Sequence, residues 1–248
     1  SPKDQQVKWF ANAVTTMLLR ACGLVSLLIA VLVGGYIATG RHNRNYGPPG
    51  LPNGFLLANS GDPKTAEEVA KAMGADMLYS GKTALITGAA SGLGRVLARH
   101  IAATGATVWL SDCDAAGLDA VAAEVRSAGG LPHPLPPDLS TEADWQAARE
   151  TVGTIDVLFN NAGVADVGPL IGSTDAAWSR QLDINLMGVV HGVEIFTPLI
   201  RSHGEGGHFI NTASMAGHWA HPNMGPYCAT KFAVVGYSEC LHEALAPE

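Results

Sequence analysis

Residues Thr83 to Gly94 read TALITGAASGLG, and the predicted fold rests on this segment. Its first five residues form an apolar run of the kind that makes a buried strand. Gly88, Gly92 and Gly94 follow, and the chain then takes up the apolar spacing of a helix. A glycine turn between a strand and a helix exposes backbone N–H groups beside the positive end of the helix dipole. The stretch therefore predicts a site for a phosphate group.

Downstream of this stretch, apolar runs alternate with helical patterns. We predict strands at residues 83–87, 107–111, 131–135, 155–160 and 208–212. We predict helices at residues 92–104, 115–128, 142–152, 175–200 and 227–246. This alternation predicts an α/β fold, a doubly wound parallel sheet of the Rossmann type with strand order 3-2-1-4-5. Sheets tolerate proline mainly at an edge, and the third strand is crowded by Pro132, Pro134, Pro136 and Pro137.

Composition argues against some partners and sites. The chain has 248 residues, of which 47% are hydrophobic and 15% are charged, and its formal net charge is -7. This negative charge argues against a nucleic-acid-binding surface. The cysteines lie far apart, without CxxC or Cys/His ligand spacing, so we predict no metal site and a reducing compartment. They are Cys22, Cys113, Cys228 and Cys240.

An uncharged run of 19 residues, Ala21 to Thr39, precedes the alternating region. It is long enough to cross a ~30 Å hydrocarbon layer as a helix, so we predict a membrane-associated protein. A buried core helix and a secretory signal are the alternatives. The basic residues on its two flanks favour a domain outside the cytoplasm, whereas the need for a soluble nucleotide favours the cytoplasm. The sequence leaves the sidedness open.

The chain divides into three parts on these signals. Residues 1–40 contain the candidate membrane helix at 21–39. Residues 41–80 form a linker whose turn signals include Gly47-Pro48-Pro49-Gly50, followed by a short amphipathic helix with Thr65 and Glu68 as its capping box. Residues 81–248 form the nucleotide-binding domain.

Asp112 ends the second predicted strand, 24 residues beyond Gly88. An acidic side chain at this place can accept both hydroxyls of an adenosine ribose, and it would repel a 2′-phosphate. The neighbouring Ser91 and Cys113 are uncharged, so nothing there compensates. The sequence therefore predicts NAD(H) rather than NADP(H), with Arg95 as the one nearby cation that could weaken the preference.

Tyr227 and Lys231 lie four residues apart at the start of the last predicted helix, so they share one face. A unit charge at ~4 Å is worth roughly 4 kcal/mol at an effective dielectric of ~20. Lys231 could therefore lower the pKa of Tyr227 from ~10 towards ~7, where general acid/base catalysis works best. The alternative is a solvated surface pair. Ser214 could likewise be a turn residue, and Asn185 a helical residue bonded to its own backbone.

Together these residues resemble the motifs of the short-chain dehydrogenase/reductase family, of the short rather than the extended type. The resemblance covers Gly81 to Glu248. In the family's order, the matching motifs are Thr87-Gly88-x-x-x-Gly92-x-Gly94, Asp112, Asn160-Asn161-Ala162-Gly163, Asn185, Ser214 and Tyr227-x-x-x-Lys231. Epimerases of the extended type space their glycines as Gly-x-x-Gly-x-x-Gly, which this chain does not match.

The resemblance implies a catalytic tetrad formed by Asn185, Ser214, Tyr227 and Lys231. Ser214 would orient the substrate oxygen, and Tyr227 would transfer the proton. Lys231 would bind the nicotinamide ribose, and Asn185 would hold a water that links Lys231 to solvent. The implied reaction is hydride transfer between NAD and a secondary alcohol or ketone, with a lipophilic substrate suggested by the candidate anchor. A nucleotide-binding scaffold or sensor with little or no turnover is the alternative function.

The resemblance also implies a cofactor site and an assembly. The cofactor-binding residues would be Thr87, Gly88, Ser91, Gly92, Leu93, Gly94, Asp112, Asp138, Leu139, Asn161, Ala162, Gly163, Tyr227 and Lys231. Asp138 would bond the adenine amino group or, alternatively, cap the next helix. Family members associate through the helices at 175–200 and 227–246, which implies a homodimer or homotetramer. They also continue into sixth and seventh strands, so we expect a domain truncated at its C-terminus, with its fifth strand as an unpaired edge.

Overall fold

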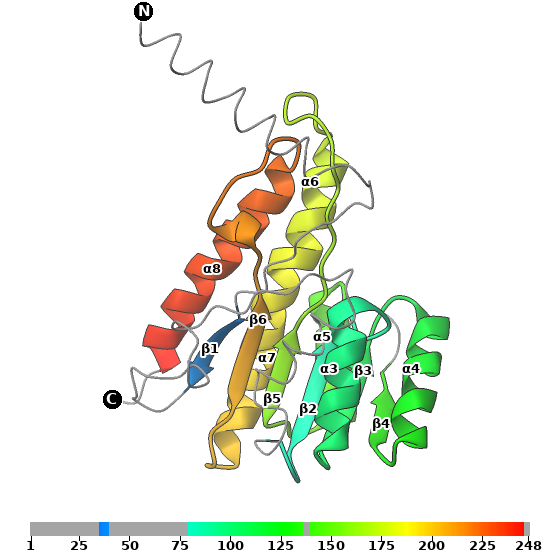
Figure 1. The fold of residues 1–248 in the computed structure, drawn as a ribbon. Helices are drawn as coiled ribbons and strands as arrows, with labels where there is room; N and C mark the ends of the chain where they lie inside the picture. The colour runs from blue at the N-terminus through cyan, green and yellow to red at the C-terminus, as the bar shows by residue number, and fades with distance from the viewer. Residues whose placement is uncertain (1–34, 40–78, 136–138, 246–248) are drawn as a thin grey trace, which may run out of the picture.

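In the part of the chain that the structure describes, a six-stranded sheet lies between layers of helices (Figure 1). The computed structural model describes residues 35–39, 79–135 and 139–245, and the strand order in the sheet is β1-β6-β5-β2-β3-β4. The strands are β1 Gly35–Thr39, β2 Thr83–Thr87, β3 Thr107–Ser111, β4 Leu131–Pro134, β5 Val157–Asn160 and β6 His208–Thr212. The neighbours from β4 to β6 pair in parallel. This confirms the predicted order 3-2-1-4-5.

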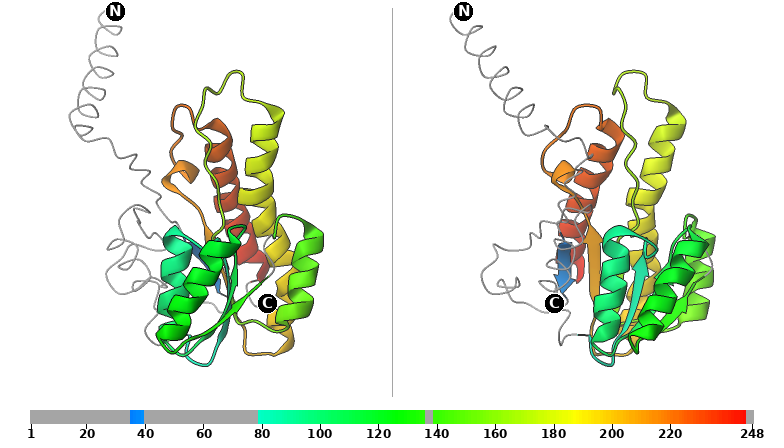
Figure 2. Two further views of the ribbon diagram at one scale, coloured as in Figure 1. Left: turned by 90° about the vertical axis from the view of Figure 1, so that its right-hand side faces the viewer. Right: turned by 45° about the vertical axis from the view of Figure 1, so that its right-hand side comes forward.

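Helices cover both faces of the sheet (Figure 2). One face carries α3 (Gly92–Ala103) and α4 (Ala115–Ser127). The other carries α5 (Glu142–Val152), α7 (Gly188–Ser202) and α8 (Gly225–Leu245). The arrangement has three layers, as a doubly wound fold requires.

The strand sequences explain why both faces are covered. Successive side chains of a strand point to opposite faces. In β2, Ala84 and Ile86 pack with α3 and α4, whereas Leu85 packs with α5 and α7. In β5, Phe159 and Leu158 divide in the same way. Because apolar side chains lie on both sides, these strands are stable only between two helical layers.

The strand β4 lies at one edge of the sheet, as its prolines predicted. It pairs with β3, with Pro132 opposite Val108 and Pro134 opposite Leu110. Proline has no N–H group to donate to a second neighbour. An edge position therefore removes the penalty that these prolines would bring to a central strand.

The opposite edge differs from the prediction. The sequence predicts an unpaired edge at β6, but β1 pairs antiparallel with it, with Gly35 opposite Thr212 and Thr39 opposite His208. The pairing provides hydrogen-bond partners for backbone groups that an open edge leaves unpaired. The helix predicted at 21–39 is therefore wrong for its last five residues. Residues 21–34 and the helix predicted after Thr65 lie outside the described residues.

The helix predicted at 175–200 consists of three segments. These are α6 (Asp175–Leu182), a π-helical turn η1 (Asp183–Met187) and α7. The turn contains Asn185. A π-helical turn widens the helix locally and is frequent at functional sites. The apolar spacing continues through this turn, so the sequence pattern gives no sign of it.

Among the described residues, one continuous helical stretch, Asp175–Ser202, is long and apolar enough to cross a membrane. Its apolar side chains have another explanation. Val193, Phe196 and Ile200 are buried in the core on the α5 and α7 face of the sheet. We therefore interpret this stretch as a core helix.

Candidate active site

The glycine turn between β2 and α3 is tight on one side and open on the other. Gly88 has a φ of +66°, and a Cβ there would lie 2.9 Å from the Ala162 Cα. A Cβ on Gly94 would overlap the carbonyl oxygen of Gly88. Gly92, with a φ of +50°, would instead point its Cβ into open space. This cradle fits a phosphate group, which would meet the first N–H groups of α3.

The side chains beside this turn divide into open and buried groups. Ser91 is exposed and makes no side-chain capping bond to α3, so its hydroxyl is available to a ligand. Leu93 is buried in the core, so only its backbone can serve the predicted cofactor site. Leu139 is partly buried against the core on the α5 face. Asp138 lies outside the described residues.

Asp112 follows β3 and is fastened to the glycine turn. Its Oδ2 accepts a hydrogen bond from the Ala90 N–H at 2.9 Å, and its Oδ1 accepts one from the Asp114 N–H at 3.0 Å. A carboxylate has about four lone-pair sites, so each oxygen can still accept from a ribose hydroxyl. Asp112 therefore shapes the phosphate cradle in addition to its predicted role.

Thr87 and Asn161 tie three strand ends together. Thr87 Oγ1 accepts hydrogen bonds from the N–H groups of Asn161 (3.0 Å) and Ala162 (2.9 Å). Asn161 Nδ2 donates back to the Thr87 carbonyl at 3.0 Å. Thr212 Oγ1 donates to Asn161 Oδ1 at 3.4 Å. These bonds hold the segment after β5 against the glycine turn and the end of β6.

Asn185 is fully buried, and its side chain is committed to protein groups. Its Oδ1 accepts from the Val164 N–H at 2.8 Å. Its Nδ2 donates to the Val164 carbonyl at 2.8 Å and to Thr230 Oγ1 at 3.1 Å. Both amide hydrogens are therefore used. The water predicted at Asn185 would have to be held by its backbone or by the second lone pair of Oδ1.

Tyr227, Ser214 and Lys231 meet beside the end of β6. All three are buried, with 3 to 5% of each residue exposed. The Ser214 side chain forms a hydrogen bond with Tyr227, which lowers the pKa of the phenol. Lys231 Nζ donates to the Thr212 carbonyl at 2.8 Å and lies 5.8 Å from the centre of the Tyr227 ring. Gly163 faces the same group, because a Cβ there would lie 3.5 Å from Lys231 Nζ.

The pKa of Tyr227 shifts in the direction opposite to the prediction. Burial raises this pKa, the hydrogen bond from Ser214 lowers it, and the nearby Cys228 raises it. Burial also lowers the pKa of Lys231 to about 8. The Lys231 ammonium points at the Thr212 carbonyl. The Tyr227 phenol and the Lys231 ammonium have both lost most of their contact with water. Desolvation therefore dominates the titration of this pair.

A second group of titratable side chains lies at the opposite end of the strands, before the amino ends of β2 and β5. Side-chain atoms of Asp156, His203 and Glu205 lie within 4.8 Å of one another, close enough to hold a metal ion. Lys82 Nζ, however, pairs with Asp156 at 3.1 Å and with Glu205 at 2.7 Å. Since this ammonium already pairs with both carboxylates, we assign no metal to the cluster.

The structure thus brings the predicted tetrad, the glycine turn, Asp112 and the segment 161–163 together at the carboxyl ends of β2, β3, β5 and β6, where doubly wound sheets bind ligands. Sequence reasoning missed Thr212, Val164 and Thr230, which hold the predicted side chains in place. Thr230 lies inside the Tyr227-to-Lys231 interval and could have been found there. Val164 acts through its backbone, and so does Thr212 where it accepts from Lys231. Residue type gives no signal for such backbone contacts.

Residues 82–248 match the family model described as short chain dehydrogenase. The chain belongs to the short-chain dehydrogenase family. Over 172 residues, the chain is 36% identical to "Probable oxidoreductase EphD" of Mycobacterium bovis, covering 67% of the chain and 29% of the relative. Over 171 residues it is 32% identical to estradiol 17-beta-dehydrogenase 11 of Mus musculus, covering 67% and 57%. The chain therefore spans less than two thirds of either relative.

Solved structures that share the fold of this chain include the following two. One is a short chain dehydrogenase/reductase from Burkholderia phymatum in complex with NAD, with a TM-score of 0.64 and 40% identity, covering 67% of this chain and 60% of that one. The other is a metagenomic short-chain oxidoreductase in complex with NADP, with a TM-score of 0.63 and 33% identity, covering 67% and 77%. Structural neighbours in the family thus bind either nucleotide.

Proposed function

We propose that this chain carries the active site of an NAD(P)-dependent oxidoreductase that interconverts a secondary alcohol and a ketone. The observation that carries the proposal is the meeting of Tyr227, Ser214 and Lys231 at the carboxyl ends of the parallel strands, where the glycine turn also lies. A phenol, a hydroxyl and an ammonium in one buried place can bind a substrate oxygen and move its proton. The bound nicotinamide nucleotide would supply or accept the hydride.

The protein groups would divide the proton chemistry as follows. Tyr227 has a raised pKa, so it is a neutral phenol at neutral pH and can donate its proton to a carbonyl oxygen. Ser214 would donate a second hydrogen bond to that oxygen and share the developing charge. Lys231, with a pKa of about 8, is mainly an ammonium at neutral pH and would stabilise the phenolate left by the transfer. Oxidation runs the same steps backwards and needs the phenolate, so it should gain from a higher pH.

Two further features narrow the proposal. The carboxylate of Asp112 beside the glycine turn supports NAD over NADP, because a 2′-phosphate placed there would meet a like charge. A relative named estradiol 17-beta-dehydrogenase supports a lipophilic alcohol as the substrate. The apolar run before β1 supports membrane association.

The substitution Tyr227→Phe tests the function, because it removes the proton-carrying hydroxyl and keeps the ring. We expect turnover to fall by roughly 10²- to 10⁴-fold, with nucleotide affinity nearly unchanged. The measurement is NADH absorbance with a panel of steroid, retinoid and small aliphatic alcohols and ketones, beside direct titration of the nucleotide. Tyr237→Phe, in the same helix, is the matched control and should keep its turnover. Wild-type turnover in Tyr227→Phe would remove the phenol from its role.

A further inference from the structure

Thr230 is a buried residue of α8 that lies between Tyr227 and Lys231. Its Oγ1 donates to the Tyr227 carbonyl at 2.8 Å and accepts from Asn185 Nδ2 at 3.1 Å. Thr230 and Asn185 are both 0% exposed, so water cannot replace either partner. The Thr230 hydroxyl therefore links the first turn of α8 to the π-helical turn η1.

The direction of these hydrogen bonds is fixed by chemistry. A backbone carbonyl can only accept, so the hydroxyl proton of Thr230 points at the carbonyl oxygen of Tyr227. The lone pairs of the Thr230 hydroxyl are then left to accept from Asn185. The NH₂ group of Asn185 must then face Thr230, and its second hydrogen reaches the Val164 carbonyl. The remaining Oδ1 accepts from the Val164 N–H. A flipped amide would set donor against donor, so the Asn185 side chain has one orientation.

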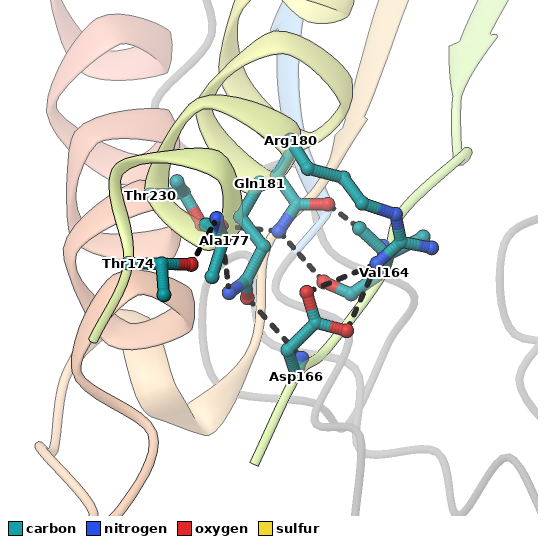
Figure 3. Close-up of polar contacts among 8 residues, drawn as sticks. Val164, Asp166, Thr174, Ala177, Arg180, Gln181 and Thr230 are labelled. Atoms are coloured by element: carbon teal, nitrogen blue, oxygen red, sulfur yellow. Dashed lines mark hydrogen bonds and ion pairs between the residues drawn. The ribbon is translucent and has the colours of Figure 1, made fainter. Parts of the chain in front are cut away.

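Val164 is the point at which this chain of bonds acts on the site (Figure 3). It directly follows Gly163, which faces Lys231 Nζ. The segment 161–163 is tied on its other side to the glycine turn through Thr87. The bonds from Thr230 therefore connect the backbone of Tyr227 to the segment 161–164, which contains predicted cofactor-binding residues. This segment forms one wall of the proposed site.

We propose that Thr230 is a positioning residue, which acts through Asn185 to set the spacing between Tyr227 and the segment 161–164. The inference rests on the proposed function and deepens it. Proton transfer from the phenol needs a fixed distance to a substrate lying against this wall, and a shift of about 1 Å at such a place can lower the rate ~10²-fold. Loss of the Thr230 hydroxyl leaves one buried N–H of Asn185 without an acceptor and frees the amide to move.

The rest of the loop after Val164 has attachments of its own. The Asp166 N–H donates to Gln181 Oε1 at 3.4 Å, and Arg180 Nη1 bonds both carboxylate oxygens of Asp166, at 2.9 and 3.0 Å (Figure 3). These contacts do not involve Thr230. Removal of the Thr230 hydroxyl should therefore loosen the loop at Val164 and leave the remainder of the fold unchanged.

The test compares Thr230→Val, which keeps the shape and loses the hydroxyl, with Thr230→Ser, which keeps the hydroxyl. We expect the valine variant to exchange the Val164 amide hydrogen about tenfold faster or more, with the glycine turn unchanged, as measured by hydrogen exchange. We expect its kcat to fall at least about tenfold while the dissociation constant for the nucleotide changes less than about threefold. The serine variant should restore both properties. In an Asn185→Ala background, Thr230→Val should have no further effect on kcat.

Three outcomes would overturn the inference. They are wild-type exchange and kcat in Thr230→Val, an equal loss in Thr230→Ser, and faster exchange across the whole domain, which would indicate a general structural role. The exchange measurement does not depend on turnover. If Tyr227→Phe keeps its activity, the proposed function fails, while the exchange data still decide whether Thr230 holds Val164.

Discussion

Lys231 carries a charge that the folded protein disfavours. It is 3% exposed, and burial lowers its pKa from 10.5 to about 8. Among the described residues, the acceptor of its hydrogen bond is a neutral carbonyl, that of Thr212. A buried ammonium without a carboxylate partner is expensive. We propose that Lys231 is retained in the core because it binds a ligand there.

This burial predicts a pH dependence of stability. Between about pH 8 and 10 the unfolded chain binds more protons at Lys231 than the folded one, so the free energy of unfolding should rise with pH. At ~1.4 kcal/mol per pKa unit, the rise should reach about 2 kcal/mol relative to Lys231→Met, measured by urea denaturation. Above about pH 10, Tyr79 and Tyr237, whose pKa values burial raises to about 12, act in the opposite direction. Parallel curves for the two proteins would show that the lysine pKa is not lowered.

Residue spacing predicted which side chains meet but not how they titrate. Tyr227 and Lys231 share a helix face, as four-residue spacing requires. The sign of the tyrosine shift depends on burial by other elements, and the direction of the Lys231 ammonium depends on a carbonyl of β6. Neither is encoded in the spacing. The same holds for Asn185, whose amide partners come from segments 21 and 45 residues away along the chain.

At the scale of single elements, α5 begins with a complete capping box. Thr141 Oγ1 accepts from the Asp144 N–H at 3.3 Å, and an Asp144 oxygen accepts from the Thr141 N–H at 2.9 Å. The first turn also carries Glu142, whose negative charge is stabilised by the positive end of the helix dipole. These local bonds fix the start of a helix that buries Trp145 against the sheet.

Thr141→Ala should therefore lower the free energy of unfolding by about 1 kcal/mol. The matched control is Thr151→Ala in the last turn of the same helix. The Thr151 hydroxyl bonds the Ala147 carbonyl within the helix, and its loss should change stability by less than about 0.5 kcal/mol. Denaturant curves of the two variants give the comparison. Equal losses would mean that the capping box contributes nothing specific.

Elements whose signals are local were predicted well, and those that depend on distant partners were not. The bounds 83–87, 107–111, 208–212 and 142–152 agree with the structure because alternation, turns and caps lie within each segment. The π-helical turn η1 surrounds Asn185, whose partners belong to other elements. The strand β1 needs β6, which follows about 170 residues later. The spacing of apolar residues along one segment carries no information about the partners of Asn185 or of β1, because these partners lie in other parts of the chain.

At the scale of the whole molecule, the site follows from topology. The carboxyl ends of the parallel strands lie on the same side of the sheet. After these ends the chain continues into the glycine turn, into Asp112 and into the segment 161–164. The strand order, and with it the place of the site, could be predicted from alternation alone. The tight fit of Gly88 against Ala162 could not, because it needs the exact distance between two strand ends.

This topology sets Asp112 beside the phosphate cradle, and nucleotide-dependent stability tests its role. Because a ligand stabilises the state that it binds, NAD should raise the melting temperature of the wild-type protein more than NADP does at equal concentration. Asp112→Ala removes the charge that repels a 2′-phosphate, so the difference between the nucleotides should shrink or reverse. The same change breaks the bond to the Ala90 N–H, so the variant without nucleotide should be less stable by about 1–3 kcal/mol.

Asp119→Ala, on the exposed face of α4, changes the net charge equally and should keep the wild-type preference for NAD. Equal stabilisation of the wild-type protein by both nucleotides would contradict the assignment of Asp112, and so would an unchanged preference in Asp112→Ala. In either case another group must read the ribose. Arg95 then becomes the first candidate, although its guanidinium is paired with Glu124 in this structure.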